Sequence, residues 1–223
     1  TLCRHVTGEE HSAEYIEHLI KSNLLIIPLD RNRSWYRLHG LFREYLQAEA
    51  LQSIDAARRQ TLLMRAAEWC EHAGRWSDSI DYAIEANALT LASTVLDRVA
   101  PMFVRDQGDL HQYIDWFERL GAGGVQCGIE ANFWYVWALV FHRRFERARQ
   151  QRDKLLDRIS QQGLGSLSEA ELTAFRRRIE VIGIGIDTYT DHLDTGERNA
   201  LRWLQQCGEG DEPFHVGTVA SAA

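Results

Sequence analysis

Apolar residues recur every three or four positions along most of the chain, the spacing of helices that bury one face. Near the start, Thr7 and Glu10 have the spacing of a capping box, and the apolar pattern that follows predicts a helix over residues 9–22. The apolar run LLIIP and the aromatic run WYRL then flank a polar turn at residues 30–33, which predicts a β-hairpin. Helical spacing resumes at Leu41. A helix, a small hairpin and a second helix are typical of the last part of a winged-helix domain.

The rest of the chain repeats at an interval close to that of tetratricopeptide (TPR) repeats, whose period is about 34 residues. Each repeat has a large apolar residue, two polar residues and then a small residue where the second helix of a hairpin begins. Four instances lie 34, 35 and 48 residues apart, with a tyrosine in place of the small residue in the second: Trp76 with Ser79, Leu110 with Tyr113, Phe145 with Ala148, and Leu193 with Gly196. One such hairpin cannot bury its own apolar face, so the hairpins must stack.

These two patterns define the predicted fold. It is mainly α, a TPR-like right-handed α-α superhelix preceded by a partial winged helix with one short β-hairpin. Residues 1–53 are assigned to the C-terminal part of the winged helix and residues 54–223 to the helical repeats, truncated at the C-terminus. We expect the Gly/Ser-rich stretch at residues 161–168 to form a longer loop that explains the interval of 48 residues. The turn of the third hairpin is predicted to be about two residues shorter than in a TPR repeat.

Several large side chains are predicted to pack inside these elements. The aromatic run NFWYVW is interpreted as core, because aromatic residues at helical spacing are more often buried than part of a ligand site. Ser168 and Glu171 have capping-box spacing at the start of the fourth hairpin. The predicted core also includes side chains of the winged helix and an anchor of the first hairpin: Leu38, Leu41, Phe42, Tyr45 and Trp76.

The composition narrows the range of functions. The chain has 223 residues, 45% of them hydrophobic and 26% charged, and its formal net charge is −7. Phosphate repels a negative surface, so this part of the protein is not expected to bind DNA or RNA. No apolar run of about 18 residues could span a membrane, and the start TLCRHVT lacks the features of a signal peptide. We therefore expect a cytoplasmic protein, and the missing initiator Met leads us to expect a fragment of a longer one.

No combination of residues predicts catalysis. There is no phosphate-binding glycine loop and no pair of carboxylates at a predicted cleft, so no catalytic residue is assigned and no enzymatic activity is expected. His11, Glu14 and His18 share one helix face, a spacing that metal sites use. They lack a fourth ligand, and a solvated polar face explains them as well, so no metal is assigned.

Two further groups of residues are interpreted as structural. The basic run at residues 143–154 is interleaved with Glu146 and Asp153, which indicates an exposed helix face rather than a nucleic-acid site. The cysteines have no CxxC spacing and are interpreted as reduced thiols that act as small core residues. They are Cys3, Cys70, Cys127 and Cys207.

In a right-handed TPR stack the first helix of each hairpin lines a concave groove, which suits ligand binding. A ligand site needs an apolar floor with a few convergent polar groups. Among the polar side chains on these helices we choose Tyr135 and Arg177 as candidate ligand-binding residues. A phenol and a fork of N–H donors suit a small polar effector or an acidic peptide. The alternative is that both are ordinary exposed polar residues.

Three motifs in this order carry a family resemblance: LLIIPLD, WYRLHGLFREYL and AAEWCEHAGRWSDSIDYAIEA. The chain resembles the MalT-like group of large LuxR-type transcriptional activators, specifically over residues 16–86 and more loosely to the end. The resemblance implies a signal-transduction ATPase with a nucleotide-binding domain, a winged helix, a TPR superhelix and a helix-turn-helix DNA-binding domain. This chain would hold only the second and third of these. ATP or ADP and DNA would therefore be bound by absent domains, and this part needs no cofactor.

The resemblance also implies a role for His39. In the wider ATPase class, a Met-His-Asp motif of the winged helix places its histidine against the phosphates of bound ADP. Leu38-His39-Gly40 stands at the matching place, and only the histidine is retained. His39 is therefore a candidate ADP-phosphate sensor in the full-length protein. The alternative is that it satisfies a local hydrogen bond where the strand meets the helix.

The function implied by the resemblance is regulatory. The repeats would bind a small-molecule inducer or a regulatory protein, and the winged helix would pass that event to the ATPase domain of the same protein. The alternative is a stand-alone TPR adaptor that scaffolds other proteins. A Walker motif upstream and a helix-turn-helix downstream would distinguish the two, and neither involves a membrane.

Overall fold

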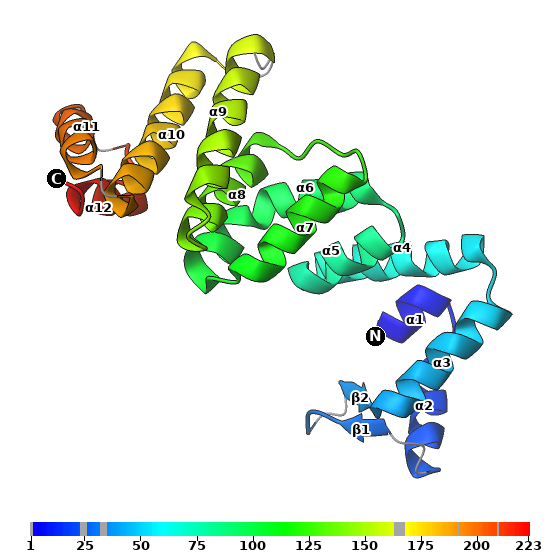
Figure 1. The fold of residues 1–223 in the computed structure, drawn as a ribbon. Coiled ribbons are helices and arrows are strands. Elements are labelled where there is room, and N and C mark those ends of the chain that lie inside the picture. Colours follow the sequence, from blue (N-terminus) through cyan, green and yellow to red (C-terminus); the bar gives the residue numbers. More distant parts are fainter. Residues whose placement is uncertain (1, 23–25, 32–34, 163–167, 191, 209) are drawn as a thin grey trace. The chain divides into compact units, whose positions relative to one another are not determined.

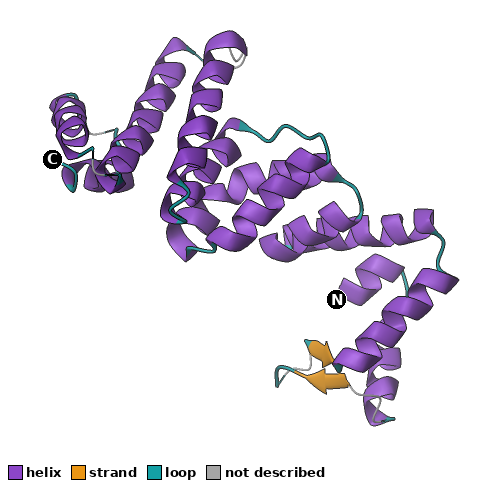
Figure 2. Cartoon of the chain, in the orientation of Figure 1, coloured by secondary structure: helices purple, strands orange, loops and turns teal. Residues whose placement is uncertain are grey.

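The structure is a computed structural model, and it describes residues 2–22, 26–31, 35–162, 168–190, 192–208 and 210–223. Within these residues it is almost entirely helical, with one sheet of two antiparallel strands (Figures 1 and 2). The predicted mainly α class with one short β-hairpin is confirmed. No helix in the described part of the chain is both long and apolar enough to cross a membrane. The chain divides into two compact units, Thr1–Val95 and Leu96–Ala223.

The first unit begins with the predicted winged-helix segment. Its elements are α1 (Leu2–Thr7), α2 (Ser12–Lys21), β1 (Ile26–Pro28), β2 (Tyr36–Leu38) and α3 (Gly40–Ser53). The strands pair with Ile27 opposite Arg37, and the Leu29 N–H donates to the Trp35 carbonyl at 2.8 Å beyond them. Residues 32–34 of the predicted turn lie outside the described residues. The expected order of helix, hairpin and helix is therefore present.

The first helix differs from the prediction for residues 9–22. Gly8 has a φ of 75°, a left-handed conformation that favours glycine, and it separates α1 from α2. The capping box of Thr7 and Glu10 does not form, because the Thr7 hydroxyl donates to the Cys3 carbonyl at 2.7 Å within α1. The predicted helix is present as α2, which begins three residues later than predicted, and only the prediction of this cap is wrong. A single sequence does not show that Gly8 is used as a helix end rather than as a loop residue.

The predicted inward face of α3 is also wrong in part. Leu38 and Phe42 are half-buried, as side chains at the edge of a core are. Leu41 and Tyr45 instead point outward and are 71% and 61% exposed. Helical spacing indicates which side chains share a face of the helix. It does not indicate whether another helix or strand among the described residues packs against that face.

The helical repeats follow in pairs along the chain. The first pair is α4 (Ala56–His72) with α5 (Trp76–Glu85), and the second is α6 (Leu89–Pro101) with α7 (Leu110–Ala122). Helix α6 continues into the π-helical turn η1 (Met102–Gln107) before α7 begins. The third pair is α8 (Ile129–Phe141) with α9 (Phe145–Gln162), and the fourth is α10 (Glu169–Tyr189) with α11 (Leu193–Gln205). The last helix is α12 (Pro213–Ala220). The boundary between the two compact units falls inside α6. The handedness of the superhelix and the domain boundary after residue 53 stay predictions.

The repeat register predicted from the sequence is confirmed. Each large apolar residue of the pattern is the first residue of the second helix in its pair: Trp76, Leu110, Phe145 and Leu193. The residue three positions later is buried every time, including Tyr113, whose hydroxyl donates to the Ala131 carbonyl at 2.9 Å. A tyrosine can take the place of a small residue here because its polar end finds a partner.

Two connections differ from the predictions. Residues 142–144 join α8 to α9 and residues 73–75 join α4 to α5, so the third turn is not shorter than the first. Residues 163–167 of the stretch predicted to form a longer loop lie outside the described residues, but the interval of 48 residues has another source. It comes from longer helices, because α9 and α10 have 18 and 21 residues whereas α7 and α8 have 13 each.

The second unit has a dense aromatic core around α8. Residues 133–140 are all buried, and Trp134 and Trp137 are 1% exposed. The Phe214 ring of α12 lies against both indoles, with centroid distances of 5.6 and 5.3 Å. Gly185 of α10 also faces Trp137, since an added Cβ would be in van der Waals contact with the indole at 3.4 Å. The interpretation of NFWYVW as core is confirmed.

Two other local predictions have opposite outcomes. The capping box at the start of α10 is present: the Glu171 N–H donates to Ser168 Oγ at 3.3 Å, and the Ser168 N–H donates to Glu171 Oε2 at 2.7 Å. Trp76, expected to be a buried anchor, is only half-buried. It is the first residue of α5, and the buried face of that helix is formed instead by Ser79, Ile80 and Ala83.

Candidate ligand pocket in the helical repeats

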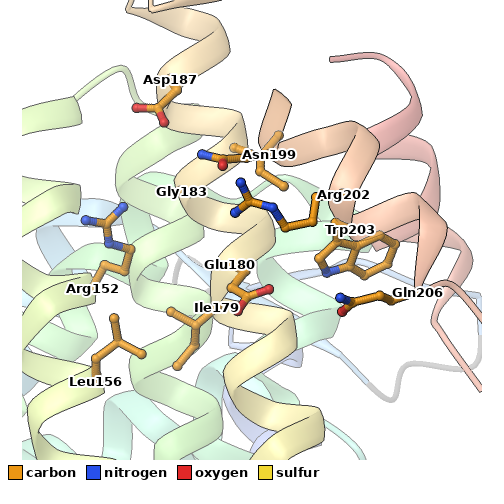
Figure 3. A pocket seen from close by; sticks show the side chains of 11 residues that line it. Arg152, Leu156, Ile179, Glu180, Gly183, Asp187, Asn199, Arg202, Trp203 and Gln206 are labelled. Atoms are coloured by element: carbon orange, nitrogen blue, oxygen red, sulfur yellow. The ribbon is translucent and has the colours of Figure 1, made fainter. Parts of the chain in front are cut away.

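Helices α9, α10 and α11 of the second unit form a pocket of about 370 Å³ (Figure 3). Small-molecule sites have volumes of about 300–1,000 Å³ and combine apolar walls with a few polar groups. This pocket has both features. Its lining residues are Arg152 and Leu156 from α9; Ile179, Glu180, Gly183, Ile184 and Asp187 from α10; Asn199, Arg202 and Trp203 from α11; and Gln206, which directly follows α11.

Helical periodicity places the central residues of the pocket on one face of α10. Glu180, Gly183 and Asp187 are spaced three and four residues apart, so they follow one another along the same side of the helix. A Cβ added at Gly183 would lie 3.0 Å from Arg152 Nη1. The absence of a side chain therefore lets the guanidinium group of Arg152 lie against α10.

Some charges at the pocket are already balanced. Arg152 donates from Nε and Nη2 to Asp153 Oδ1, at 3.0 and 2.8 Å. Arg149 Nη1 donates to Asp187 Oδ1 at 3.4 Å. Arg152 Nη1 takes no part in the first pair and stays at the pocket beside α10. The pocket therefore keeps one N–H donor group from an arginine that is otherwise paired.

Three polar side chains of the pocket are unpaired. Glu180, Asn199 and Arg202 make no hydrogen bond or ion pair with any residue that the structure describes. Glu180 and Arg202 are exposed to solvent, and Asn199 is half-buried. A carboxylate, an amide and a guanidinium group are thus free to contact a ligand.

Arg177 lies behind the wall of the pocket rather than in it. Its guanidinium carbon is 4.0 Å from the centroid of the Trp203 ring, and Nη2 donates to the Trp203 carbonyl at 3.1 Å. The two oxygens of Asp211 accept from Nε and Nη2, both at 3.1 Å, and the hydrogen bond from Arg177 lowers the pKa of Asp211. Arg177 Nη1 also donates to Gln206 at 3.3 Å. It therefore fixes two pocket residues, and its direct binding of a ligand stays a prediction.

Tyr135, the other candidate from the sequence, is not at this pocket. It is 2% exposed, its hydroxyl donates to Glu118 Oε1 at 3.1 Å, and its ring stacks on Phe117 with centroids 4.0 Å apart. Burial raises the pKa of Tyr135 to about 12, with Arg147 opposing the rise and Glu118 adding to it. Tyr135 and Arg177 contact different residues, so the structure does not bring them into one site. The role of Tyr135 in binding stays a prediction.

His39 is exposed at the N-cap position of α3 in the first unit. Its backbone is extended, with φ −59° and ψ 142°, and its carbonyl accepts from the Arg43 N–H at 2.9 Å. The ring has no hydrogen-bond partner in the described part of the chain. The local hydrogen bond expected of the side chain is therefore made by the backbone. The proposed phosphate contact stays a prediction.

The histidine and arginine patterns of the sequence have local explanations. His11 Nδ1 lies 3.1 Å from Glu14 Oε1, and this hydrogen bond raises the pKa of His11. Among the described residues no three His, Cys, Asp or Glu side chains are placed to hold a metal ion. In the basic run, Arg147 Nη2 lies 3.0 Å from Glu118 Oε1, and Arg149 and Arg152 pair with carboxylates as described above. Three arginines of the basic run thus pair with acidic side chains.

The interpretation of the cysteines holds for two of them. Cys70 and Cys127 are buried, whereas Cys3 and Cys207 are exposed, so the prediction that all four are core thiols is wrong. All four are free. Burial raises the pKa of the Cys70 thiol, with the nearby carboxylate of Asp78 adding to the rise. Cys70 is therefore held as a neutral thiol in the first hairpin.

Sequence reasoning missed the pocket itself. It placed Arg152 on a solvated face and did not single out Arg202. The signal that exists is the one-sided pattern of α11, whose buried face consists of Gly196, Ala200 and Trp203. This pattern places Arg202 beside the buried face. It does not show which other helix lies opposite.

Comparison with known proteins agrees with the fold. Residues 1–59 match the family described as the MalT winged helix domain. The HTH-type transcriptional regulator AlkS of Alcanivorax borkumensis is 23% identical over 205 residues, covering 92% of this chain and 23% of the relative. The regulator MalT of Vibrio campbellii is 24% identical over 219 residues, covering 98% of this chain and 21% of the relative. No solved structure matches the chain.

A winged-helix segment followed by TPR-like helical hairpins defines the class of fold to which the chain belongs. The matches make this class more specific: the chain is similar to MalT- and AlkS-type transcriptional regulators over nearly all of its length. The MalT-like resemblance seen in the motifs is thereby confirmed. The chain spans about a fifth of the length of these curated relatives.

Proposed function

We propose that the chain is the regulatory core of an ATP-dependent, LuxR-type transcriptional activator of the cytoplasm. Its helical repeats bind an inducer or a regulatory protein, and its winged-helix segment transmits this event to the ATPase domain of the same protein. A separate C-terminal domain binds DNA. The observation that carries the proposal is the match of residues 1–59 to the MalT winged helix domain, with similarity to HTH-type regulators over 92% and 98% of the chain.

The pocket in the second unit supports a sensor role for the repeats. Ligand binding shifts a conformational equilibrium only if the ligand has different affinities for the two states. A pocket formed by three helices from two successive pairs meets this condition, because any change in how the pairs pack alters its walls. Arg177 joins α10 to the end of α11 through Trp203 and Asp211, and so couples the pocket to the chain that follows.

The winged-helix segment offers a surface for the ATPase domain. Large apolar side chains on α3 are exposed, and Leu41 and Tyr45, four residues apart, lie on one face of the helix, where a partner could cover them. The segment also contacts the first repeat hairpin: the Arg75 guanidinium carbon lies 3.9 Å from the centroid of the Trp35 ring. The exposed large apolar residues of α3 are Leu41, Tyr45, Leu46 and Leu51. One segment therefore has an apolar surface for a partner and a contact with the repeats.

His39 supplies the proposed nucleotide sensor. The ring is exposed, without a partner among described residues, and it precedes the first N–H groups of the helix α3, where anions are favoured. In the full-length regulator we expect His39→Ala to weaken ADP binding and to raise transcription in the absence of inducer. The matched control is His5→Ala, because His5 is also exposed but lies on α1. Unchanged ADP affinity and basal transcription in His39→Ala would leave His39 with a local role only.

The division of labour between domains can be tested directly. The isolated chain is expected to hydrolyse no ATP, because it has no phosphate-binding glycine loop. It is also expected to bind no DNA sequence specifically in a mobility-shift assay at low salt, because its net charge is −7. The full-length regulator is expected to do both, and to lose its response to inducer when residues 96–223 are deleted. A deletion variant with a normal dose response would contradict the sensor role of the repeats.

A further inference from the structure

The pocket between α9, α10 and α11 contains free groups of both charges. Arg202 and Glu180 are unpaired among the described residues, and Arg152 Nη1 is left over from the pair with Asp153. Arg202 and Glu180 line the same pocket, and neither is paired with the other. The pocket therefore has a cationic part and an anionic part, each able to receive a ligand group.

The cationic part is centred on Gly183. Arg152 comes from α9 and Arg202 from α11, and in Figure 3 their guanidinium groups lie on either side of Gly183. Two guanidinium groups with free N–H donors are suited to a carboxylate, which accepts several such hydrogen bonds. Asp187, one turn further along α10, does not oppose this because Arg149 balances its charge.

The anionic part lies one turn away in the other direction. Glu180 precedes Gly183 by three residues on α10, which is about 4.5 Å along a helix axis at about 1.5 Å per residue. A ligand that fills both parts must therefore carry a carboxylate and a cationic group a few bonds apart. The carboxylate and the ammonium of a free α-amino acid have this arrangement.

The remaining wall of the pocket is apolar. Ile179 and Leu156 lie near Glu180, and Trp203 presents its indole from α11 (Figure 3). Trp203 is held in place by its Nε1 hydrogen bond to the Arg177 carbonyl at 3.1 Å. A fixed aromatic ring beside aliphatic side chains accommodates an apolar ligand side chain and disfavours a charged one.

We propose that this pocket binds a free α-amino acid with an apolar side chain; its role as an inducer site rests on the proposed function. The carboxylate of the ligand lies between Arg152 and Arg202. The ammonium lies at Glu180, and the side chain packs against Trp203 and Ile179. The amide of Asn199 can accept a hydrogen bond from the ligand ammonium or donate one to the ligand carboxylate.

Calorimetric titration of the purified chain tests the binding. The ligands are phenylalanine and leucine, together with 3-phenylpropionate, which lacks the amine, and phenethylamine, which lacks the carboxylate. Phenylalanine or leucine is expected to bind saturably. Each truncated compound is expected to bind at least about tenfold more weakly, since the loss of one charge-assisted hydrogen bond reduces the affinity by about that factor. No saturable binding of either amino acid overturns the proposal. Equal affinity for 3-phenylpropionate also overturns it, in favour of a simple carboxylate.

Two substitutions assign the ligand groups to residues. Arg202→Gln is expected to weaken phenylalanine and 3-phenylpropionate about tenfold and to leave phenethylamine unchanged. Glu180→Gln is expected to weaken phenylalanine and phenethylamine and to leave 3-phenylpropionate unchanged. Both side chains are exposed, so the fold is expected to persist, as a thermal melt would check. Arg198→Gln is the matched control, because Arg198 is exposed on α11 outside the pocket.

A reporter assay with the full-length regulator distinguishes two claims: that the pocket binds an amino acid, and that this binding controls transcription. If phenylalanine or leucine binds the chain but neither changes transcription, the pocket assignment stands and the sensor function fails. If transcription responds to another compound and the chain binds no amino acid, the pocket assignment fails and the sensor function stands. If Arg202→Gln loses both binding and response, both are supported together.

Discussion

The winged-helix segment and the second unit differ most in how they treat apolar side chains. Among the described residues up to Ser53, only Ser12 is buried, whereas α8 alone buries nine residues. The segment instead exposes large apolar side chains on its helices and hairpin. They are Tyr15, Ile27, Leu29, Trp35, Leu41, Tyr45, Leu46 and Leu51.

This difference indicates which part of the chain contributes most to the stability of the fold. Burial of apolar surface is the main favourable term in folding, at about 25 cal/mol per Å², so a segment without a core depends on its neighbours. In this chain those neighbours are α4 and the turn that follows it: Arg65 Nη1 donates to the Val6 carbonyl at 3.2 Å, and Arg75 lies over Trp35. The winged-helix segment is therefore expected to open at lower free energy than the second unit.

The largest effect is expected from removing an aromatic ring from the dense core. Trp137→Ala is expected to lower the free energy of unfolding of the second unit by about 3–5 kcal/mol, as other large-to-small core changes do. Tyr45→Ala, the matched change in the winged-helix segment, is expected to change stability by less than about 0.5 kcal/mol because its side chain is exposed. Urea unfolding followed by circular dichroism measures both. Similar losses for the two variants would contradict the comparison.

A pH change should also act on the second unit. His215 of α12 is 2% exposed and its ring packs on Phe133 with centroids 5.7 Å apart. Burial lowers the pKa of His215 below its ordinary 6.5, and the positive charge of Arg178 adds to this, while carboxylates nearby oppose it. The unfolded state then binds a proton that the folded state does not. The free energy of unfolding is therefore expected to fall as pH drops below 6.5, until pH reaches the lowered value.

The measurement is the unfolding midpoint at about pH 7.5 and about pH 5.5, on either side of the ordinary histidine pKa. His215→Phe is the control, since it keeps a ring among the aromatic side chains but cannot be protonated. We expect the variant to lose most of the pH dependence in this range. The same pH dependence in both proteins would show that other groups cause it.

A smaller effect is expected at two turns that match in geometry. Gly74 after α4 and Arg143 after α8 both have positive φ, 71° and 59°, and their N–H groups donate to carbonyls three residues earlier. A non-glycine residue in this conformation costs about 1 kcal/mol. Gly74→Ala is therefore expected to destabilise the first unit by about that amount, and Arg143→Gly to stabilise the second. Thermal melts would check both, and a gain from Gly74→Ala would contradict the assigned turn geometry.

Much of the fold could be predicted from the sequence because it depends on local patterns. The start of each second helix was found from a large apolar residue and a small one three positions later, since that pair sets how closely two neighbouring helices approach. The capping box of Ser168 and Glu171 is similarly local. The outward face of Leu41 and the half-burial of Trp76 could not be predicted, because each depends on whether another element lies opposite.

The candidate site was harder to predict for the same reason. Arg152 and Arg202 are 50 residues apart and lie on different helices, so no local pattern joins them. Arg177 was chosen for its fork of donors, and the structure uses that fork on Asp211 and the Trp203 carbonyl, behind the pocket wall. Tyr135 was chosen as a polar group on an apolar helix. Its hydrogen-bond partner Glu118 lies on the preceding helix α7. The spacing of residues along α8 therefore gives no indication of this contact.

The smallest effect expected concerns the contact that joins the two halves of the first unit. The Trp35 ring is 39% exposed, and the Arg75 guanidinium above it also pairs with Asp78 at 2.7 Å. A cation–π pair at such an exposed site contributes about 0.5–1 kcal/mol. A double-mutant cycle with Trp35→Ala and Arg75→Ala removes the contribution of Asp78, because the loss of that pair occurs in both arms of the cycle. We expect a coupling free energy of about 0.5–1 kcal/mol in urea unfolding of the first unit. A coupling of zero would mean that the β-hairpin and the first repeat hairpin are energetically independent. Transmission from the repeats would then have to pass through α1, which contacts α4, rather than through the hairpin.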